Sequence, residues 1–157
     1  METRIPQAKR IDQIMTRHPV TIGYEESIQK GSDLMLQHRF RHLPVTDSMG
    51  EVIGILSDRD IQRAMEVRKQ GIEVEMVISP TRRIKDFMSW PPHTISDELS
   101  LSEVIRFMIR EKISALLVHS AKTGKVRGII TTEDLLKEFG RLLETYSPQE
   151  GALLERR

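Results

Sequence analysis

The stretch GILSDRDI, residues 54–61, recurs in nearly the same form as GIITTEDL at residues 128–135. Each copy runs glycine, two apolar residues, a hydroxyl residue, two polar residues, aspartate and one apolar residue. An apolar run followed by Ser/Thr-x-x-Asp is typical of a strand that hands over to a capped helix. The repetition predicts that the chain contains two copies of one structural unit.

The match extends well beyond these eight residues. The two copies align at an offset of 73 residues, which becomes 74 after a one-residue insertion in a turn of the second copy. Matched apolar, hydroxyl and turn residues keep their order along the chain, which chance does not produce. The pairs include Ile11 with Ile84, Met15 with Met88, Thr21 with Thr94, Ile22 with Ile95, Gly54 with Gly128 and Asp60 with Asp134.

Each copy predicts the element order β-α-β-β-α. In the second copy, Leu101, Val104, Ile105 and Met108 follow helical spacing after a capping pair, Ser100 and Glu103. The predicted segments of that copy are a strand at 93–95, strands at 115–120 and 125–131 around a turn, and a helix at 131–146. The first copy predicts a strand at 20–22, a helix at 27–38, strands at 42–46 and 51–56, and a helix from Asp58.

A three-stranded unit of this kind cannot cover both faces of its sheet alone. The predicted fold class is therefore α/β (α+β), with two tandem β-α-β-β-α repeats packed about a pseudo-twofold axis. The predicted boundaries are an N-terminal tail at 1–10, a first repeat at 11–68, a linker at 69–83 with one short strand around 74–77, a second repeat at 84–140, and a helix end and tail at 141–157.

Composition excludes several classes of function. The 157 residues contain no cysteine, so disulfides, thiolate catalysis and zinc–thiolate sites are absent. A formal net charge of +1 provides no overall field that favours nucleic acid. The charged N-terminus lacks an apolar signal region, and no apolar run approaches the roughly 20 residues of a membrane span. We expect a cytoplasmic protein that binds neither membranes nor nucleic acid.

Catalytic and metal-binding motifs are absent from the sequence. The five histidines show no metal-ligand spacing, and there is no glycine-rich phosphate loop and no nucleophile elbow. We expect a protein that is not an enzyme, that holds no metal and that requires no cofactor.

The segments DQIMTRHPVTI, HLPVTDSMGEVIGILSDRDI, KDFMSWPPHTI and GKVRGIITTEDL together resemble a CBS domain pair, or Bateman module, over about residues 11–140. The resemblance implies adenine nucleotides (AMP, ADP or ATP) or S-adenosylmethionine as regulatory ligands, held in clefts between the repeats. It also implies a sensor role and a homodimer formed through exposed helix faces. The apolar stripe Leu135, Leu136, Phe139, Leu142 and Leu143 exceeds what one helix needs for its own core, in agreement with that homodimer.

Ser57 with Asp60, and Thr131 with Asp134, form the candidate ribose site. From the residues alone, each pair is a capping box that starts a helix. A carboxylate is also an acceptor-only partner for the two hydroxyls of a ribose. In the family that the chain resembles, these aspartates hold the ribose and the hydroxyl residues assist. The two roles are compatible, because one residue can cap a helix and bind a ligand.

The resemblance also assigns purine and phosphate contacts. Thr21, Ile22, Thr94 and Ile95 lie where the family lines its purine pocket, although Thr and Ile favour strands in any case. Candidate phosphate contacts are Arg41, His42, Arg59 and Lys112, for which a solvated charged loop is the alternative. The second copy has Ser114, Ala115 and Glu133 at the positions of Arg41, His42 and Arg59, so we expect the two clefts to bind unequally.

Three hypotheses are compatible with the sequence. The leading one is a regulatory module that binds an adenine nucleotide and signals its occupancy to an effector protein. The second is an interaction scaffold whose clefts have degenerated, in agreement with the neutral loop and Glu133 of the second copy. Nucleic-acid binding is the third, and the balanced charge opposes it.

Overall fold

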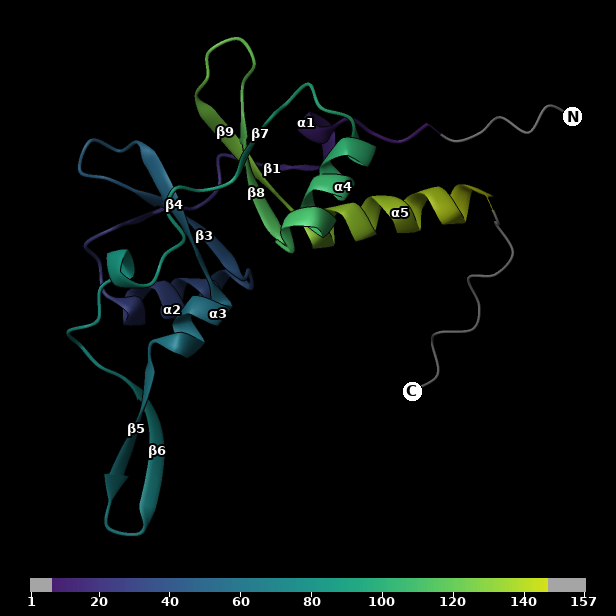
Figure 1. Ribbon diagram of the computed structural model, residues 1–157. Helices are drawn as coiled ribbons and strands as arrows, with labels where there is room; N and C mark the ends of the chain where they lie inside the picture. Colours follow the sequence, from purple (N-terminus) through teal and green to yellow (C-terminus); the bar gives the residue numbers. More distant parts are fainter. Residues whose placement is uncertain (1–6, 147–157) are drawn as a thin grey trace, which may run out of the picture. The chain divides into compact units, whose positions relative to one another are not determined.

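The computed structural model describes residues 7–146, which fall into two compact units (Figure 1). One unit comprises His18–His93. The other combines the N-terminal segment up to Arg17 with the chain from Thr94 onward. The outermost parts of the predicted tails, at 1–6 and 147–157, lie outside the described residues.

The unit at 18–93 contains a three-stranded sheet in the order β2-β3-β4. Strand β2 is parallel to β3, which is antiparallel to β4. A separate two-stranded hairpin, β5-β6, follows the sheet in the chain. The elements are β2 (Ile22–Gly23), α2 (Ile28–His38), β3 (His42–Thr46), β4 (Val52–Ser57), α3 (Asp58–Arg63), β5 (Met65–Gln70), β6 (Glu73–Ile78) and the 3₁₀ turn η1 (Ile84–Asp86).

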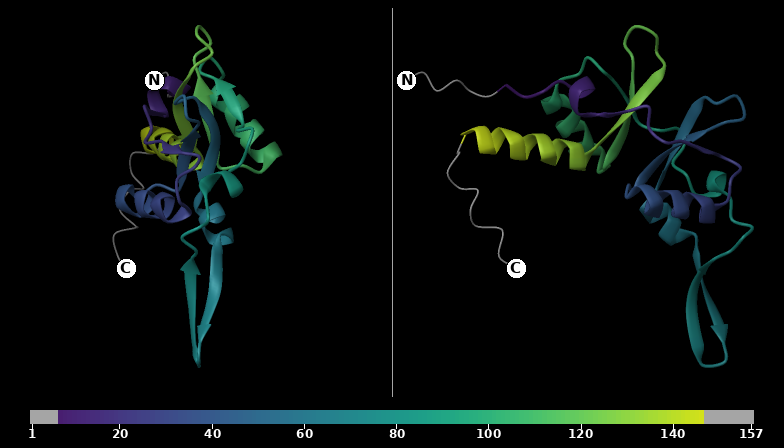
Figure 2. Two further views of the ribbon diagram at one scale, coloured as in Figure 1. Left: turned by 90° about the vertical axis from the view of Figure 1, so that its left-hand side faces the viewer. Right: turned by 180° about the vertical axis from the view of Figure 1, so that it is seen from behind.

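The other unit repeats this plan with one strand more. Its sheet has the order β1-β9-β8-β7, in which β7 is parallel to β8 and the other pairs are antiparallel. Helices α4 and α5 of this unit are seen from two further directions in Figure 2. The elements are α1 (Ile11–Ile14), β1 (Thr16–Arg17), β7 (Thr94–Ser96), α4 (Leu101–Glu111), β8 (Ala115–His119), β9 (Val126–Thr131) and α5 (Thr132–Tyr146).

The predicted α/β (α+β) class and the element order β-α-β-β-α are confirmed in both repeats. The structure shows three local features that the sequence did not predict. The helix that begins at Asp58 ends at Arg63 after six residues, whereas its counterpart α5 has 15. The single strand predicted in the linker is one half of the β5-β6 hairpin. Strand β1, which pairs with β9, is absent from the sequence-based expectation.

Helices α2 and α4 begin and end in the same way. The Ser27 hydroxyl accepts a hydrogen bond from the backbone N–H of Lys30, and the Ser100 hydroxyl accepts one from Glu103. Each helix ends at a non-glycine residue in the left-handed region, Arg39 with φ 57° and Lys112 with φ 54°. Matching caps therefore set the boundaries of both helices, and the left-handed residue at each C-terminus turns the chain toward the strand that follows.

Each unit takes part of its core from the leading segment of the other repeat. Ile84, which opens the second repeat, is fully buried in the core of the unit at 18–93. Ile11 and Met15, which open the first repeat, are buried in the core of the other unit. The exchanged segments contribute apolar area that the two repeats would otherwise lack, and that burial stabilises each unit.

Two glycines allow these exchanged segments to approach the sheets. A Cβ atom on Gly54 would lie 2.9 Å from the carbonyl oxygen of Ser89, and one on Gly128 would lie 2.9 Å from that of Thr16. The Ser89 segment is also held by backbone hydrogen bonds of 2.9 and 3.2 Å to Ile55. The two matching glycines of the repeated sequence are thus required by close backbone contact.

We expect Gly128→Ala to lower the free energy of unfolding by roughly 1–3 kcal/mol, because the added methyl overlaps the backbone of Thr16. Gly140→Ala is the matched control. Gly140 lies inside α5, and a Cβ added there would meet no atom within 4 Å, so alanine should raise stability by about 0.5–1 kcal/mol. Thermal and urea unfolding measure both changes. Equal midpoints for the two variants would contradict the close approach.

A buried carboxylate ties the N-terminal segment to α5. Glu138 accepts hydrogen bonds from the backbone N–H of Lys9 at 2.8 Å and from the Arg141 guanidinium at 2.7 and 2.8 Å. The same guanidinium donates to the carbonyl oxygen of Gln7 at 3.1 Å. The hydrogen bonds from Arg141, together with that from Lys9, hold the pKa of Glu138 at about 2, although burial opposes the shift.

The depressed pKa predicts a loss of stability in acid. A carboxyl whose pKa is lower in the folded state stabilises the fold fully above its ordinary pKa of 4.5, and this contribution is lost as pH falls toward 2. Glu138→Gln should lose about 1–3 kcal/mol at pH 7 and should show a weaker pH dependence below 4.5. Unfolding midpoints between about pH 2.5 and 7 test this. Glu144→Gln, an exposed change on the same helix, should keep the wild-type profile.

Candidate functional site

Both Ser/Thr-x-x-Asp motifs form complete capping boxes at the strand-to-helix junctions. Asp60 Oδ2 accepts from the backbone N–H of Ser57 at 2.8 Å and from its hydroxyl at 2.7 Å. Asp134 Oδ2 accepts the same two bonds from Thr131, at 2.8 and 2.9 Å. In each junction the cap therefore uses only Oδ2 of the aspartate, and Oδ1 takes no part in the cap.

The second oxygen distinguishes the repeats. Asp60 is 5% exposed, and its Oδ1 lies 3.4 Å from the guanidinium of Arg63. The position equivalent to Arg63 is Lys137, whose ammonium instead pairs with Glu133 at 2.8 Å. Within residues 7–146, Oδ1 of the half-buried Asp134 takes no hydrogen bond or ion pair. The carboxylate of the second repeat is therefore the more open to a ligand.

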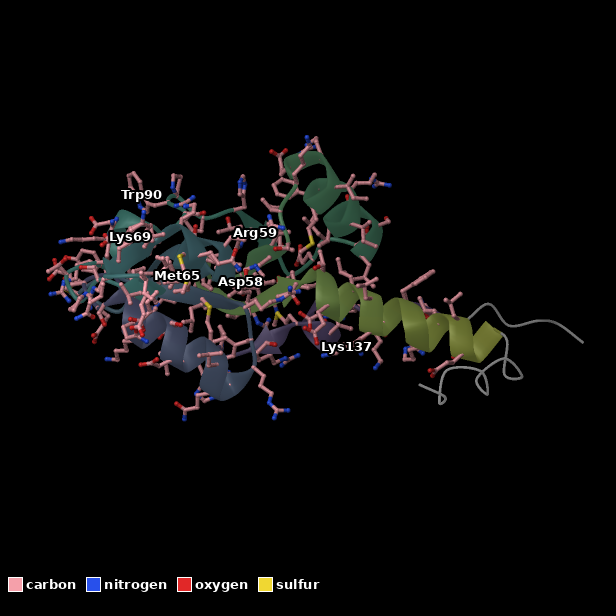
Figure 3. The ribbon with its side chains drawn as sticks, turned by 90° about the horizontal axis from the view of Figure 1, so that it is seen from below. Asp58, Arg59, Met65, Lys69, Trp90 and Lys137 are labelled. Atoms are coloured by element: carbon pink, nitrogen blue, oxygen red, sulfur yellow. The ribbon has the colours of Figure 1, made fainter. Side chains whose placement is uncertain are left out.

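Basic side chains surround the junction of the first repeat. Arg41 is joined to it by a 3.0 Å hydrogen bond from the backbone N–H of Asp58 to the Arg41 carbonyl oxygen. His42 opens β3 directly opposite Ser57 of β4. Arg59 is exposed on the first turn of α3, beside Asp58 (Figure 3). The three predicted phosphate contacts of this repeat thus meet at the junction that carries the capping box.

Burial decides the charge of His42. Loss of hydration lowers the pKa of this half-buried imidazole below 6.5, and the nearby Asp58 carboxylate offsets only part of that shift. His42 is consequently neutral near pH 7 and can offer a hydrogen bond but no charge. Among the predicted phosphate contacts, the positive charge comes from Arg41 and Arg59, both of which are exposed.

The junction of the second repeat is built the same way from different side chains. The backbone N–H of Thr132 donates to the carbonyl oxygen of Ser114 at 3.0 Å, as Asp58 does to Arg41. Lys112 lies two residues before Ser114, exposed at the left-handed end of α4. Glu133 takes the place of Arg59 and is paired with Lys137. This junction carries less positive charge than that of the first repeat.

The predicted purine residues lie across the sheets from the capping boxes. Thr21 precedes β2, and Thr94 opens β7, each with an exposed side chain. Ile22 and Ile95 are buried in the two cores. In each sheet one strand separates these residues from the strand that ends in the capping box. Two strand spacings correspond to roughly 10 Å.

A hollow of about 180 Å³ opens beside Asp134. The N-terminal segment forms one wall and α5 the other, and the lining residues are Lys9, Gln13, Ile14, Asp134, Lys137, Glu138 and Arg141. Sequence reasoning missed Lys9, Lys137 and Arg141 here. Lys9 is 129 positions from Glu138, which its backbone contacts, and no local motif marks such a distant pair.

A larger hollow of about 850 Å³ lies at the start of α4 and contains none of the predicted site residues. Its Asp97 carboxylate is already bonded to the backbone N–H of Ala121 at 3.0 Å and to Arg127 at 2.7 Å. These bonds hold the pKa of Asp97 below its ordinary value. Because its Asp97 carboxylate is already bonded within the protein, this hollow is a weaker candidate than the junctions, despite its size.

Metal-binding clusters and membrane spans are both missing from residues 7–146. That part of the chain has no group of three or more His, Asp or Glu side chains that could hold a metal ion. None of its helices is both long and apolar enough to cross a membrane.

Comparison with known proteins agrees with the internal repeat. The family model described as "CBS domain" matches the chain twice, at residues 11–67 and 84–141. A curated relative, the L-aspartate semialdehyde sulfurtransferase of Methanocaldococcus jannaschii, is 28% identical over 130 residues. The match covers 83% of this chain and 23% of that protein. The chain therefore spans less than a quarter of the length of that relative.

Solved structures share the fold. The CBS domain pair of protein MJ0100, determined with 5′-methylthioadenosine and S-adenosyl-L-methionine, superposes with a TM-score of 0.70 at 24% identity. That match covers 86% of this chain and 98% of the other. CBSX2 in complex with AMP gives a TM-score of 0.67 at 18% identity and covers 85% and 98% of the two chains. At these identities the likeness establishes the fold.

Proposed function

Because the chain belongs to the CBS domain family, we propose that it is a regulatory module that binds an adenosine ligand at its two capping-box junctions. Ribose would be held by Asp60 and Asp134, with help from Ser57 and Thr131. The backbone next to Thr21 and Thr94, together with Ile22 and Ile95, would form the purine pocket. The MJ0100 and CBSX2 structures, which hold adenosine compounds on the same fold, support this class of ligand.

The observation that carries the proposal is the division of roles within each aspartate. Oδ2 is used by the cap, which fixes the carboxylate in place. Oδ1 is available at Asp134 and only weakly held at Asp60, since Arg63 is 65% exposed and its ion pair is long. A fixed carboxylate with a spare oxygen is a preorganised acceptor for the hydroxyls of a ribose.

We propose that the two junctions prefer adenosine ligands with different numbers of phosphates. Arg41 and Arg59 would neutralise the phosphates of a nucleotide at the first repeat, with His42 as a neutral donor. Of the four predicted phosphate contacts, only Lys112 belongs to the second repeat. Glu133 of that repeat carries a negative charge, which disfavours a bound phosphate. An adenosine compound with few or no phosphates suits that junction better.

A thermal-shift series tests ligand binding directly. AMP, ADP, ATP, S-adenosylmethionine and methylthioadenosine should be added to protein freed of bound nucleotide. A ligand at about 100 times its Kd stabilises the folded state by about 2.7 kcal/mol, which raises the melting temperature by several degrees. At least one of the five compounds should produce that shift. No shift with any of them would overturn the proposal and favour the scaffold hypothesis.

Aspartate-to-asparagine variants test the site. Asp60→Asn and Asp134→Asn keep one oxygen for the cap and remove the charged acceptor, so affinity should fall at least about tenfold for whichever junction is occupied. The matched control is Glu103→Gln, because Ser100 and Glu103 form the same capping box at 2.6 and 2.8 Å on α4. Calorimetric Kd values should be unchanged in the control. Unchanged affinity in both aspartate variants would remove them from the site.

Signalling requires a partner, and we propose both a homodimer and an effector protein. The exposed fractions of Leu136, Phe139 and Leu143 on α5 are 67%, 57% and 52%, which leaves an apolar stripe uncovered. In the unit at 18–93 an apolar groove of about 410 Å³ lies between α2 and α3. These helix faces are the proposed dimer contacts. Transmission would follow from a ligand that favours one arrangement of the repeats, in a cytoplasmic protein without catalytic activity of its own.

The scaffold hypothesis remains the second candidate for one reason. Arg63 already contacts the second oxygen of Asp60, so the first junction is satisfied without a ligand. If the protein is a scaffold, added nucleotide should leave its melting temperature unchanged. Arg63→Ala should then destabilise α3 without changing any ligand affinity.

A further inference from the structure

The β5-β6 hairpin, residues 65–78, distinguishes the first repeat from the second. In the second repeat α5 continues for 15 residues, whereas α3 ends after six and the chain turns into β5 (Figure 1). The strands are joined by the two-residue turn Gly71-Ile72, in which Gly71 has φ 66° and Ile72 is fully exposed. Neither strand has a second neighbour among the described residues, so both edges of this small sheet are free.

The hairpin has one apolar and one charged face. Side chains alternate along each strand, and the register pairs Met65 with Ile78, Val67 with Met76 and Lys69 with Val74 on one face. Val67 and Met76 are 57% and 54% exposed, so this face is uncovered beyond Ile78, which packs against the core. The opposite face carries Glu66, Arg68, Gln70, Glu73, Glu75 and Val77. A two-stranded sheet with an open apolar face is marginal by itself and gains stability from further strands.

The register also tells which backbone groups point outward. A two-residue turn makes Gln70 and Glu73 the hydrogen-bonded closing pair. Hydrogen-bonded and non-hydrogen-bonded pairs then alternate away from the turn. The N–H and C=O groups of Met65, Val67 and Lys69 consequently face away from β6, along the free edge of β5.

We propose that β5 pairs antiparallel with β5 of a second copy of this chain, about a twofold axis at Val67. In this register Val67 lies opposite Val67 of the copy, and Met65 lies opposite Lys69. All three carry outward N–H and C=O groups, as hydrogen-bonded pairs require. Glu66 lies opposite Arg68 twice, at non-hydrogen-bonded positions where side chains come closest. The product is a four-stranded sheet whose apolar side chains share one face with Lys69 of each copy.

The charges on the strands favour a twofold axis at Val67 over axes at the neighbouring residues. Axes at Glu66 or Arg68 would place like charges directly opposite each other, which is destabilising. Pairing through β6 about Glu75 would oppose two glutamates, and pairing about Met76 would form no ion pair. The edge of β5 is therefore self-complementary, and the glutamates of β6 disfavour the other edge.

The existing ion pair of Glu66 is compatible with this contact. Arg82 donates to Glu66 from both Nε and Nη2, and both bonds fall on Oε1. The second carboxylate oxygen thus remains for Arg68 of the copy. The Arg82 contact also holds the Glu66 side chain in place, which reduces the entropy lost on pairing.

Disulfide cross-linking tests the pairing, because the chain has no native cysteine. Val67→Cys places two thiols opposite each other at the axis, within the Cα separation that a disulfide spans. Val74→Cys is the matched control, since Val74 lies on the same face with 64% exposure but would lie more than three strand spacings, over roughly 14 Å, from its copy. Mild oxidation should cross-link the Val67→Cys variant and leave the Val74→Cys variant monomeric on non-reducing gels. Equal cross-linking of the two variants, or none of Val67→Cys, overturns the proposal.

Charge reversal within the Val67→Cys protein tests the register itself. Arg68→Glu and Glu66→Arg each place like charges opposite each other, so each alone should slow cross-linking about tenfold. Mixing the two variants restores opposite charges in the mixed dimer and should recover cross-linking, as mixed dimers only. Failure of the mixture to recover overturns the register. Cross-linking at Met76→Cys in place of Val67→Cys would assign the contact to β6 and would equally reject the proposal.

Discussion

Each compact unit of this protein depends on a short segment from the other sequence repeat, packed against a strand glycine too closely for any side chain. The carbonyl oxygen of Ser89 lies over Gly54 and that of Thr16 over Gly128, while Ile84 and Ile11 complete the two cores. A repeat cut out at its sequence boundaries would lack these residues and expose apolar strand surface. The compact units are therefore offset from the sequence repeats, and the segment His18–His93 contains every residue of the core that includes Ile84.

The same strands that receive these segments end in the capping boxes. Gly54 and Gly128 precede Ser57 and Thr131 by three residues, so the packed glycine and the helix start belong to one rigid strand. The aspartate of each box therefore uses one oxygen for structure and has its second oxygen positioned by the cap. Capping and binding need not compete, because a carboxylate has acceptor positions for both.

Sequence periodicity predicted the helices and strands of each β-α-β-β-α repeat, because the same pattern occurs twice in the chain. Residues 65–70 had no such second occurrence, and Met, Glu, Arg, Lys and Gln are all good helix formers. Their strand conformation comes from pairing with β6 across the Gly71 turn, which local propensity does not encode. The partner of Lys137 was equally beyond the sequence. Carboxylates lie three and four residues before this lysine, and only the folded geometry shows that Lys137 contacts Glu133, whereas Arg63 contacts Asp60.

The hairpin gives the two junctions different surroundings. Asp60 and Met65 are separated by one short helical turn, in which the backbone N–H of Ala64 donates to the Asp60 carbonyl oxygen at 3.1 Å. Ala64 itself is fully buried, so the start of β5 is anchored to the turn that carries the candidate ribose acceptor. Asp134 has only the continuing helix α5 behind it. Any ligand effect on β5 pairing would therefore arise at the first junction, and linkage requires that pairing alter ligand affinity there by the same factor.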